Sequence, residues 1–311
     1  GQCLTPHLQG LAAAGARFER CYAPNPICSP PRASLFTGYL PHAHGVTDVT
    51  HAVPAPMAEL REGLPFWSRE LEAAGYRTGY FGKWHIERSD ELERFGFQEY
   101  EVDLRLVGVQ EHTEPLLRSL TVRQPGYKDL LVAGVSAAPA SASRERALFE
   151  RGGEFVRAGA LERARPWALV ISTEAPHDPF IAPQEYFARY DPDAIEQPAS
   201  FRDPLTDKPT IYRRIREAWS GLQWEDFAFA SACYYALCSM LDDEVGRLLA
   251  LLEETGQAQD TLVVFTSDHG DYLGAHGLLL KGVAAFEEAY RVPLLMRGPG
   301  VTPGLVIDEP V

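Results

Sequence analysis

A cysteine and an arginine, Cys28 and Arg32, flank the pair Pro30-Pro31 and form the segment best suited to chemistry. Proline is favoured in the first turn of a helix, so a helix is predicted to begin here, and the free backbone amides of a helix start favour an anion. Arg32 adds a planar set of N–H donors that match sulfate or phosphate oxygens. A thiol in such surroundings is expected to be reactive. We therefore predict an anion site with a nucleophile at residue 28.

A lysine and a histidine, Lys83 and His85, follow a predicted strand over residues 76–81. Side chains two residues apart on an extended chain point to the same side, so one site could use both. The isolated pattern would more often be an exposed lysine and a surface histidine. Its place after the Cys28 segment favours the functional interpretation.

Two further groups of polar residues follow apolar runs that are typical of buried strands. His177 and Asp178 come after the run 167–171, and Asp268 and His269 come after residues 261–266 and Ser267. Open α/β sheets place ligands at the carboxyl ends of their strands, so we expect these side chains near one another. Oxygen-rich ligand sets select Ca²⁺ or Mg²⁺, whereas a histidine ligand leaves room for Mn²⁺.

Four segments together resemble the sulfatase family, in that family's order and over nearly the whole chain. They are C-S-P-P-R from Cys28, G-Y-R-T-G-Y-F-G-K-W-H ending at His85, A-P-H-D-P around His177, and S-D-H-G from Ser267, followed by Lys281. The resemblance implies an α/β fold of the alkaline phosphatase type, with a mostly parallel central sheet between helices. It also implies hydrolysis of a sulfate monoester, from a small molecule or a carbohydrate, to an alcohol and inorganic sulfate.

The same resemblance implies a modified nucleophile and a metal. Cys28 would be oxidised to formylglycine by a formylglycine-generating enzyme, and the hydrated aldehyde would attack sulfur. Arg32 and a divalent metal would stabilise the attacking oxygen. Residue 28, Asp268 and His269 would hold the metal, with Ca²⁺ as first choice and Mg²⁺ or Mn²⁺ as alternatives.

The remaining matched residues would bind the sulfuryl group and move protons. Lys83 and Lys281 would neutralise sulfuryl oxygens, His177 would protonate the departing alcohol, and His85 would take a proton from the second hydroxyl of residue 28. Asp178 either touches substrate or orients His177, and the sequence favours neither. Structural roles are favoured for Asp271 and His276. Four residues would suit a sugar ring but are equally typical of packing: Trp84, Asp178, Tyr186 and Tyr190.

Two other functions are compatible with these motifs. A phosphonate monoester or phosphodiester hydrolase of the same superfamily can also carry formylglycine and an Asp-His metal pair, although the Lys83-x-His85 pair favours sulfate. A non-catalytic homologue that binds sulfated glycans would keep the fold without modification of residue 28.

The resemblance further predicts that residues 1–311 are a sulfatase catalytic domain without its first strand and its C-terminal subdomain. That strand would end in an Asp pair that binds the metal. The chain instead opens at a predicted helix, with Thr5 as N-cap, Pro6 in the first turn and Gly15 as C-terminal stop.

The elements between the motifs alternate. Helices at 67–74, 144–163 and 224–254 lead into strands at 76–81, 167–173 and 261–266, and residues 292–297 form another predicted strand. Such repeats favour a mostly parallel sheet covered on both faces. The proline-rich stretches 86–143 and 182–222 are predicted to be irregular insertions at the pocket mouth.

Composition agrees with one large globular domain, because 311 residues with 45% hydrophobic content can bury a sizeable core. A formal net charge of −14 argues against general nucleic-acid binding. No stretch is long and apolar enough to span a membrane. The five cysteines do not suggest a disulfide framework, and a cytoplasmic and a periplasmic or secreted location both stay open, as does the oligomeric state.

Overall fold

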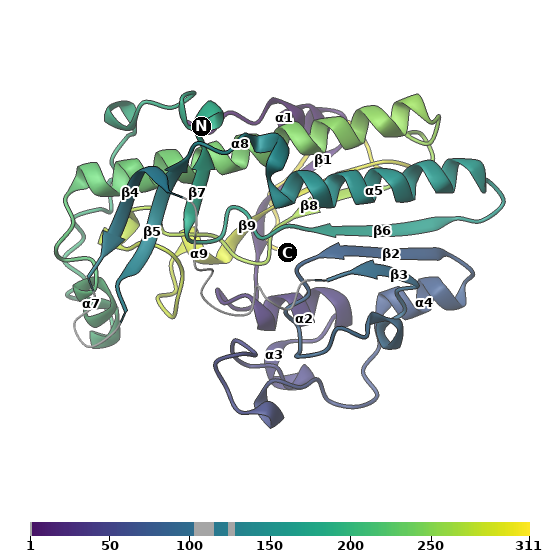
Figure 1. Cartoon of the computed structure of the whole chain (residues 1–311). Coiled ribbons are helices and arrows are strands. Elements are labelled where there is room, and N and C mark those ends of the chain that lie inside the picture. Colours follow the sequence, from purple (N-terminus) through teal and green to yellow (C-terminus); the bar gives the residue numbers. More distant parts are fainter. Residues whose placement is uncertain (1, 103–114, 124–127) are drawn as a thin grey trace.

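The computed structural model describes residues 2–102, 115–123 and 128–311 as an α/β protein (Figure 1). Its helices are α1 (Pro6–Ala13), α2 (Ser29–Thr37), α3 (Pro41–His44), α4 (Trp67–Ala73), α5 (Arg144–Leu161), α6 (Gln184–Phe187), α7 (Thr210–Glu217), α8 (Trp224–Glu254) and α9 (Glu287–Tyr290). Its strands are β1 (Ala16–Tyr22), β2 (Arg77–Gly82), β3 (Glu99–Glu101), β4 (Leu116–Val122), β5 (Leu130–Ser136), β6 (Trp167–Ser172), β7 (Phe180–Pro183), β8 (Val263–Thr266), β9 (Arg291–Arg297) and β10 (Leu305–Ile307).

The described strands form three sheets, ordered β10-β1-β9-β8, β3-β2-β6 and β4-β5-β7. The pairs β1–β10, β2–β3, β2–β6 and β5–β7 are parallel, whereas β1–β9, β4–β5 and β8–β9 are antiparallel. Figure 1 shows α5 on one side of β2 and β6 and α4 on the other. The predicted α/β class with parallel strands between helices is confirmed. The register Gly82↔Ser172 aligns the carboxyl ends of β2 and β6, so the residues that follow them start side by side.

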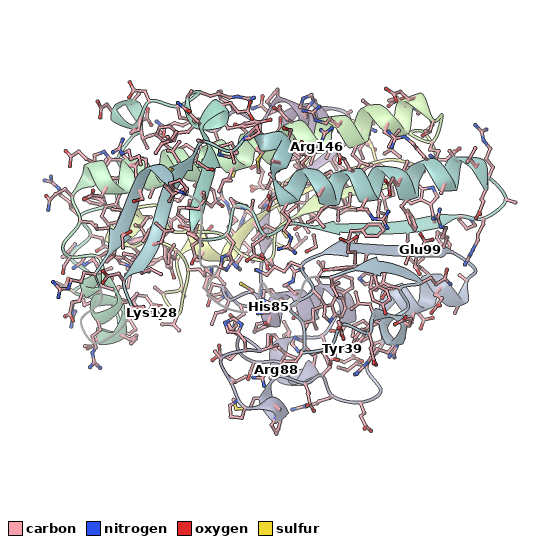
Figure 2. All side chains as sticks on the ribbon, viewed as in Figure 1. Tyr39, His85, Arg88, Glu99, Lys128 and Arg146 are labelled. Carbon is pink, nitrogen blue, oxygen red and sulfur yellow. The ribbon has the colours of Figure 1, made fainter. Side chains whose placement is uncertain are left out.

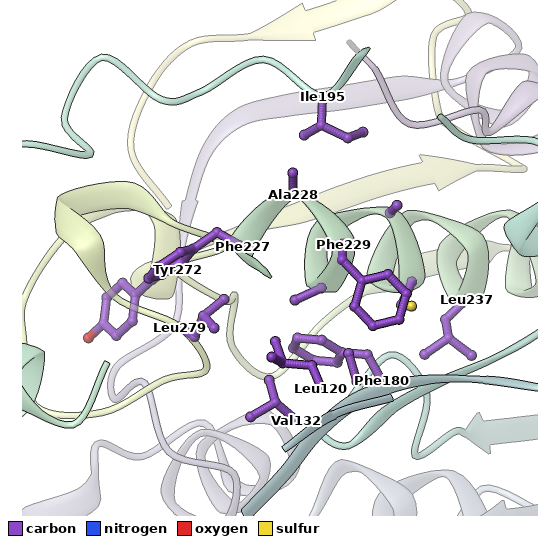
Figure 3. Close-up of a cluster of buried hydrophobic side chains, with 14 of the residues drawn as sticks. Leu120, Val132, Phe180, Ile195, Phe227, Ala228, Phe229, Leu237, Tyr272 and Leu279 are labelled. Carbon is purple, nitrogen blue, oxygen red and sulfur yellow. The ribbon is translucent and has the colours of Figure 1, made fainter. Parts of the chain in front are cut away.

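The long helix α8 organises the largest core. Its sequence spaces apolar residues three and four apart, which places them on one face of the helix. From that face, Phe227 and Leu237 are buried, and Figure 3 shows α8 side chains above Val132 of β5 and Phe180 of β7. The predicted helix 224–254 therefore coincides with α8, and the predicted helix-to-strand pairs 67–81 and 144–173 appear as α4–β2 and α5–β6.

The expectation of irregular structure was wrong for parts of the two proline-rich stretches. The first contains β3, β4 and β5, and the second contains the end of β7 together with α6 and α7. Residues 103–114 and 124–127 of the first stretch lie outside the described residues. Leu120 and Val122 of β4 are buried against the α8 core, so tertiary packing supplies the stabilisation that short local patterns did not reveal.

Both termini of the first helix, α1, also differ from the prediction. The Thr5 side chain makes no capping bond. Instead the buried carboxylate of Asp242, on α8, accepts hydrogen bonds from the amides of His7 at 3.0 Å and Leu8 at 2.7 Å. Gly15 does not have a positive φ. A Cβ there would lie 2.0 Å from the Met296 carbonyl oxygen, so glycine allows close approach to β9.

Candidate active site

Cys28 lies immediately before α2, whose first turn holds Pro30 as predicted. Its side chain is buried, and its Sγ lies 3.3 Å from Nε2 of His269. Burial alone would raise the pKa of this thiol. The charge of Lys83 and interactions with the neighbouring rings of His177, His269 and His85 nevertheless hold the pKa well below its usual range. Residue 28 is therefore at the centre of a group of positive and hydrogen-bonding side chains that come from distant segments.

Arg32 lies one turn into α2, and the protein itself engages most of its N–H groups. Nε donates to the Trp84 carbonyl at 2.8 Å, and Nη1 donates to Oδ2 of Asp268 at 3.2 Å. Nη2 donates to Ser172 Oγ at 2.5 Å, to Tyr80 Oη at 3.0 Å and to the Lys83 carbonyl. A guanidinium has five N–H groups, so one Nη1–H has no acceptor among the described residues. Arg32 thus fixes the site and keeps one donor for an anion.

Lys83 and His85 follow β2, as predicted, and both influence Cys28. The Lys83 backbone amide donates to the Ser172 carbonyl at 2.8 Å, which continues the β2–β6 pairing. Its Nζ lies 3.3 Å from Oε1 of Glu174. His85 has a positive φ of 53°, and its Nε2 lies 3.1 Å from Nδ1 of His51. Figure 2 shows His85 near the carboxyl end of β2, on the side of α2 and α3.

After β6, His177 and Asp178 form a compact group with Lys281, which lies in the segment after β8. His177 Nδ1 donates to the Asp178 carbonyl at 2.6 Å, while its Nε2 lies 2.5 Å from Lys281 Nζ. Asp178 Oδ1 also binds Lys281 Nζ at 2.5 Å. Burial lowers the pKa of His177, but its hydrogen bond with Cys28 and the charge of Asp178 produce a net upward shift. These contacts favour orientation of His177 and Lys281 as the role of Asp178.

Asp268 and His269 follow β8, and the His269 ring lies beside both Cys28 and His177. Burial opposes ionisation of Asp268, yet His269 and Arg32 lower its pKa. Burial also opposes the charged form of His269, but Asp268 and Cys28 raise its pKa to about 9. Ligand atoms of Cys28, His177 and His269 lie within 4.8 Å of one another. Asp268 Oδ1 is 3.9 Å from His269 Nε2, so it borders this group.

The predicted metal ligands are therefore together, and they fit part of a divalent-ion site. Asp268 supplies a hard oxygen and His269 a nitrogen, whereas a thiol at residue 28 suits softer metals than Ca²⁺. An oxygen at residue 28 would make the set more suitable for Ca²⁺, which takes six to eight oxygen ligands. The described residues supply only a part of such a shell.

Several residues with open roles are packed into the protein. Trp84 is 2% exposed within an aromatic cluster, and Tyr186 and Tyr190 are also buried, so packing is their role.

His276 stacks on Phe286 and its Nδ1 lies 2.7 Å from Asp203 Oδ2, which is a structural arrangement. Asp271 is half-buried beside the cavity, and burial, with repulsion from Asp178, raises its pKa to about 7.

A cavity of about 1710 Å³ extends from these residues along β6 and β8. Among the described strands, β6 pairs only with β2 and β8 only with β9, so each has one edge without a strand partner. Leu262, just before β8, and Val264, on β8, are large apolar residues that are each 51% exposed. The cavity is therefore lined by backbone edges and apolar side chains as well as by the polar group around Cys28.

The sequence did not predict that Glu174 and His51 would contact residues of the site. Glu174 contacts Lys83, and its Oε1 also lies 3.6 Å from His177 Nδ1. His51 contacts His85 from a loop that carries no strand or helix signal. Glu174 could have been found from its place after a buried strand, whereas no feature of the sequence indicates His51.

The chain matches the family model described as Sulfatase over residues 2–311. It is 32% identical over 317 residues to the choline-sulfatase of Rhizobium meliloti (strain 1021), covering 96% of this chain and 59% of that relative. It is 29% identical over 299 residues to the uncharacterized sulfatase YidJ of Escherichia coli (strain K12), covering 95% of this chain and 58% of that relative. The chain thus spans less than two thirds of the length of these curated relatives.

Among solved structures, the phosphonate monoester hydrolase SpPMH from Silicibacter pomeroyi superposes with a TM-score of 0.79 at 26% identity, covering 100% of this chain and 66% of that chain. The yidJ protein from Bacteroides fragilis gives a TM-score of 0.73 at 24% identity, over 99% of this chain and 66% of that chain, and supports the fold alone. In the described part of the chain, no helix is both long and apolar enough to cross a membrane.

Proposed function

Since this chain belongs to the sulfatase family, we propose that it hydrolyses a sulfate monoester to an alcohol and inorganic sulfate. The substrate is a small-molecule or carbohydrate sulfate ester. The observation that carries the proposal is the convergence of Arg32, Lys83 and Lys281 with three histidines around Cys28. Positive charge held in place before substrate arrives is usually the largest contribution to this kind of transfer.

Two groups beyond the unmodified chain belong to the proposal. Formylglycine formed from Cys28 would supply a hydroxyl of its hydrated aldehyde as nucleophile. A divalent metal, Ca²⁺ before Mg²⁺ or Mn²⁺, would be held by residue 28, Asp268 and His269 and would offset negative charge at that oxygen. The low pKa of the Cys28 thiol supports this position as one where an anionic atom is stabilised.

The side chains of the site then have distinct tasks. Lys83 and Lys281 now bind the carboxylates of Glu174 and Asp178, and each would exchange that contact for a sulfuryl oxygen. Movement of Lys281 towards sulfate frees Nε2 of His177, which is proposed to donate a proton to the departing oxygen. His85 is proposed to take a proton from the second hydroxyl of residue 28, so that sulfate leaves and the aldehyde returns. Each proton transfer contributes typically ~10²–10⁴-fold.

The cavity along β6 and β8 supports a second element of the proposal. We propose that a strand from outside residues 1–311 pairs with both free edges and brings the further carboxylate ligands that the family resemblance implies. This strand would complete the metal shell around Asp268 and His269. The remainder of the sulfatase domain, including its smaller C-terminal part, is proposed on the same resemblance.

A phosphonate monoester hydrolase is the alternative that one observation favours, namely the structural similarity to SpPMH. The full-length protein should be compared on an aryl sulfate and on the matching aryl phosphonate ester. Faster hydrolysis of the sulfate supports our proposal, whereas faster hydrolysis of the phosphonate supports the alternative. A protein that binds sulfated glycans and hydrolyses neither ester would be the non-catalytic homologue.

The nucleophile is tested by co-expressing the full-length protein with a formylglycine-generating enzyme. Peptide mass spectrometry should show an aldehyde in place of the Cys28 thiol, and Cys28→Ala should abolish sulfate release. Cys21→Ala is the matched control, because Cys21 is a partly buried thiol on β1 and should leave turnover unchanged. Unmodified Cys28 in an active preparation would contradict the proposed nucleophile.

A further inference from the structure

A pair of histidines, His51 and His85, meets at the edge of the site. His51 Nδ1 and His85 Nε2 are 3.1 Å apart, the ring planes differ by 13°, and the ring centroids are 5.2 Å apart. The ring planes are nearly parallel and the two nitrogens are close, but the ring centroids are far apart. The two rings therefore meet edge to edge. This is the geometry of an in-plane N–H···N hydrogen bond rather than of face-to-face stacking.

The direction of this hydrogen bond follows from the other nitrogen of His85. Nδ1 of His85 is buried and has no partner among the described residues. If His51 donated, the neutral His85 ring would carry its hydrogen on Nδ1 as a buried donor without an acceptor, which is rare and unfavourable in proteins. If His85 Nε2–H donates to His51, Nδ1 keeps a lone pair instead. His85 is then ready to accept a proton at Nδ1.

His51 is suited to the accepting role. Burial and the neighbouring His85 lower the pKa of His51, with Lys83 and Arg88 adding to the shift and Cys28 opposing it, so its ring is neutral. Its loop is also anchored. The amide of Thr50 donates to Ser29 Oγ at 3.2 Å, and the Thr50 carbonyl accepts from Arg88 Nε at 2.8 Å. His51 is thus tied to the segment next to Cys28 on one side and to the residues after His85 on the other.

We propose that His51 is a positioning residue that fixes His85 in the Nε2–H form and so presents Nδ1 to the hydroxyl of residue 28. This inference rests on the proposed function. In the proposed step the O–H bond at residue 28 breaks, an N–H bond forms at Nδ1 of His85, and the resulting imidazolium keeps its Nε2–H bond to neutral His51. Nothing in the sequence motifs assigns a role to His51.

The hydrogen bond can be tested without any activity. In ¹⁵N-labelled full-length protein, NMR should show the His85 proton on Nε2 and a through-bond coupling from this nitrogen to Nδ1 of His51. The coupling should vanish in His51→Ala and persist in His42→Ala, since His42 is an exposed histidine on α3. A His85 ring that carries its proton on Nδ1 in the wild-type protein would overturn the proposal.

Kinetics separate positioning from substrate binding. In the formylglycine-bearing protein, His51→Ala should lower kcat about 10- to 100-fold, the range seen when a residue that orients a functional histidine is removed, with KM unchanged. His51→Asn should recover part of this loss, because its amide oxygen can accept the same bond, and His42→Ala should match the wild type. An unchanged kcat, or a change confined to KM, would overturn the positioning role. A wild-type protein that hydrolyses no sulfate ester would instead contradict the proposed function, and the NMR result would still decide the hydrogen bond.

Discussion

Replacing Arg32 by lysine should destabilise the domain although the charge is kept. Arg32 is 9% exposed, and its donors reach the Trp84 carbonyl, Ser172 Oγ and Asp268 Oδ2 from three different segments. A lysine ammonium has three N–H groups on one nitrogen and cannot reach three acceptors that a planar guanidinium spans. At least two of these acceptors, which are buried or half-buried, should therefore lose their donor.

The size of the effect follows from that count. A buried polar group left without its partner costs about 1–3 kcal/mol. Two such groups predict a loss of about 2–6 kcal/mol in the free energy of unfolding. The Lys83 carbonyl is not counted, because the Tyr80 hydroxyl also donates to it.

Urea denaturation of Arg32→Lys beside Arg17→Lys measures this difference. Arg17 is an exposed arginine that pairs with Glu19 on β1, so the same chemical change there should stay within about 0.5 kcal/mol. The product of the slope m and the midpoint shift gives the loss for each variant. Equal midpoints for the two variants would refute the claim that the Arg32 hydrogen bonds hold the site together.

Three other predictions concern proton transfer, metal binding and pH. His177→Ala should slow hydrolysis of alkyl sulfates far more than that of acidic phenyl sulfates, since good leaving groups need no proton, and equal losses would count against the donor role. Asp268→Ala should lower metal occupancy, measured by elemental analysis, together with the sulfatase rate, and full activity after chelation would refute the assignment. Burial raises the pKa of Asp271 to about 7, so the native state binds more protons than the unfolded state between about pH 4 and 7, and stability should fall as pH rises through that window. Asp271→Asn should remove this fall, which is up to about 4 kcal/mol for a shift of about three units, and urea midpoints that show the same pH dependence in both proteins would contradict it.

Much of the site could be predicted because each reactive residue follows a strong local pattern. The apolar run before His177 and the run before Asp268 both form strands, and their carboxyl ends do converge on Cys28. The Pro30-Pro31 pair correctly marked the start of α2. Such patterns are local, so they can be recognised in the sequence without knowledge of the tertiary structure.

The partners of these residues could not be predicted, because they depend on contacts between distant segments. Glu174 meets Lys83 across 91 positions, and Asp242 caps α1 across 235 positions. For Trp84 the sequence left a sugar-binding role and packing equally open, and its contacts with Phe95 and Phe36 favour packing. Sequence patterns also missed β4 and β5, whose pairing is stabilised by the core around α8.

The free edges of β6 and β8 have a consequence for the behaviour of residues 1–311 in solution. Unpaired strand edges are templates for pairing with other chains, and natural proteins normally cover them. Here the edges flank a cavity beside the exposed apolar side chains of Leu262 and Val264. A solution of this segment alone should therefore self-associate through intermolecular β-pairing, increasingly so as its concentration rises. A peptide strand that fits the cavity should suppress that aggregation, so the unpaired strand edges beside the proposed metal site would also determine the colloidal stability of the segment.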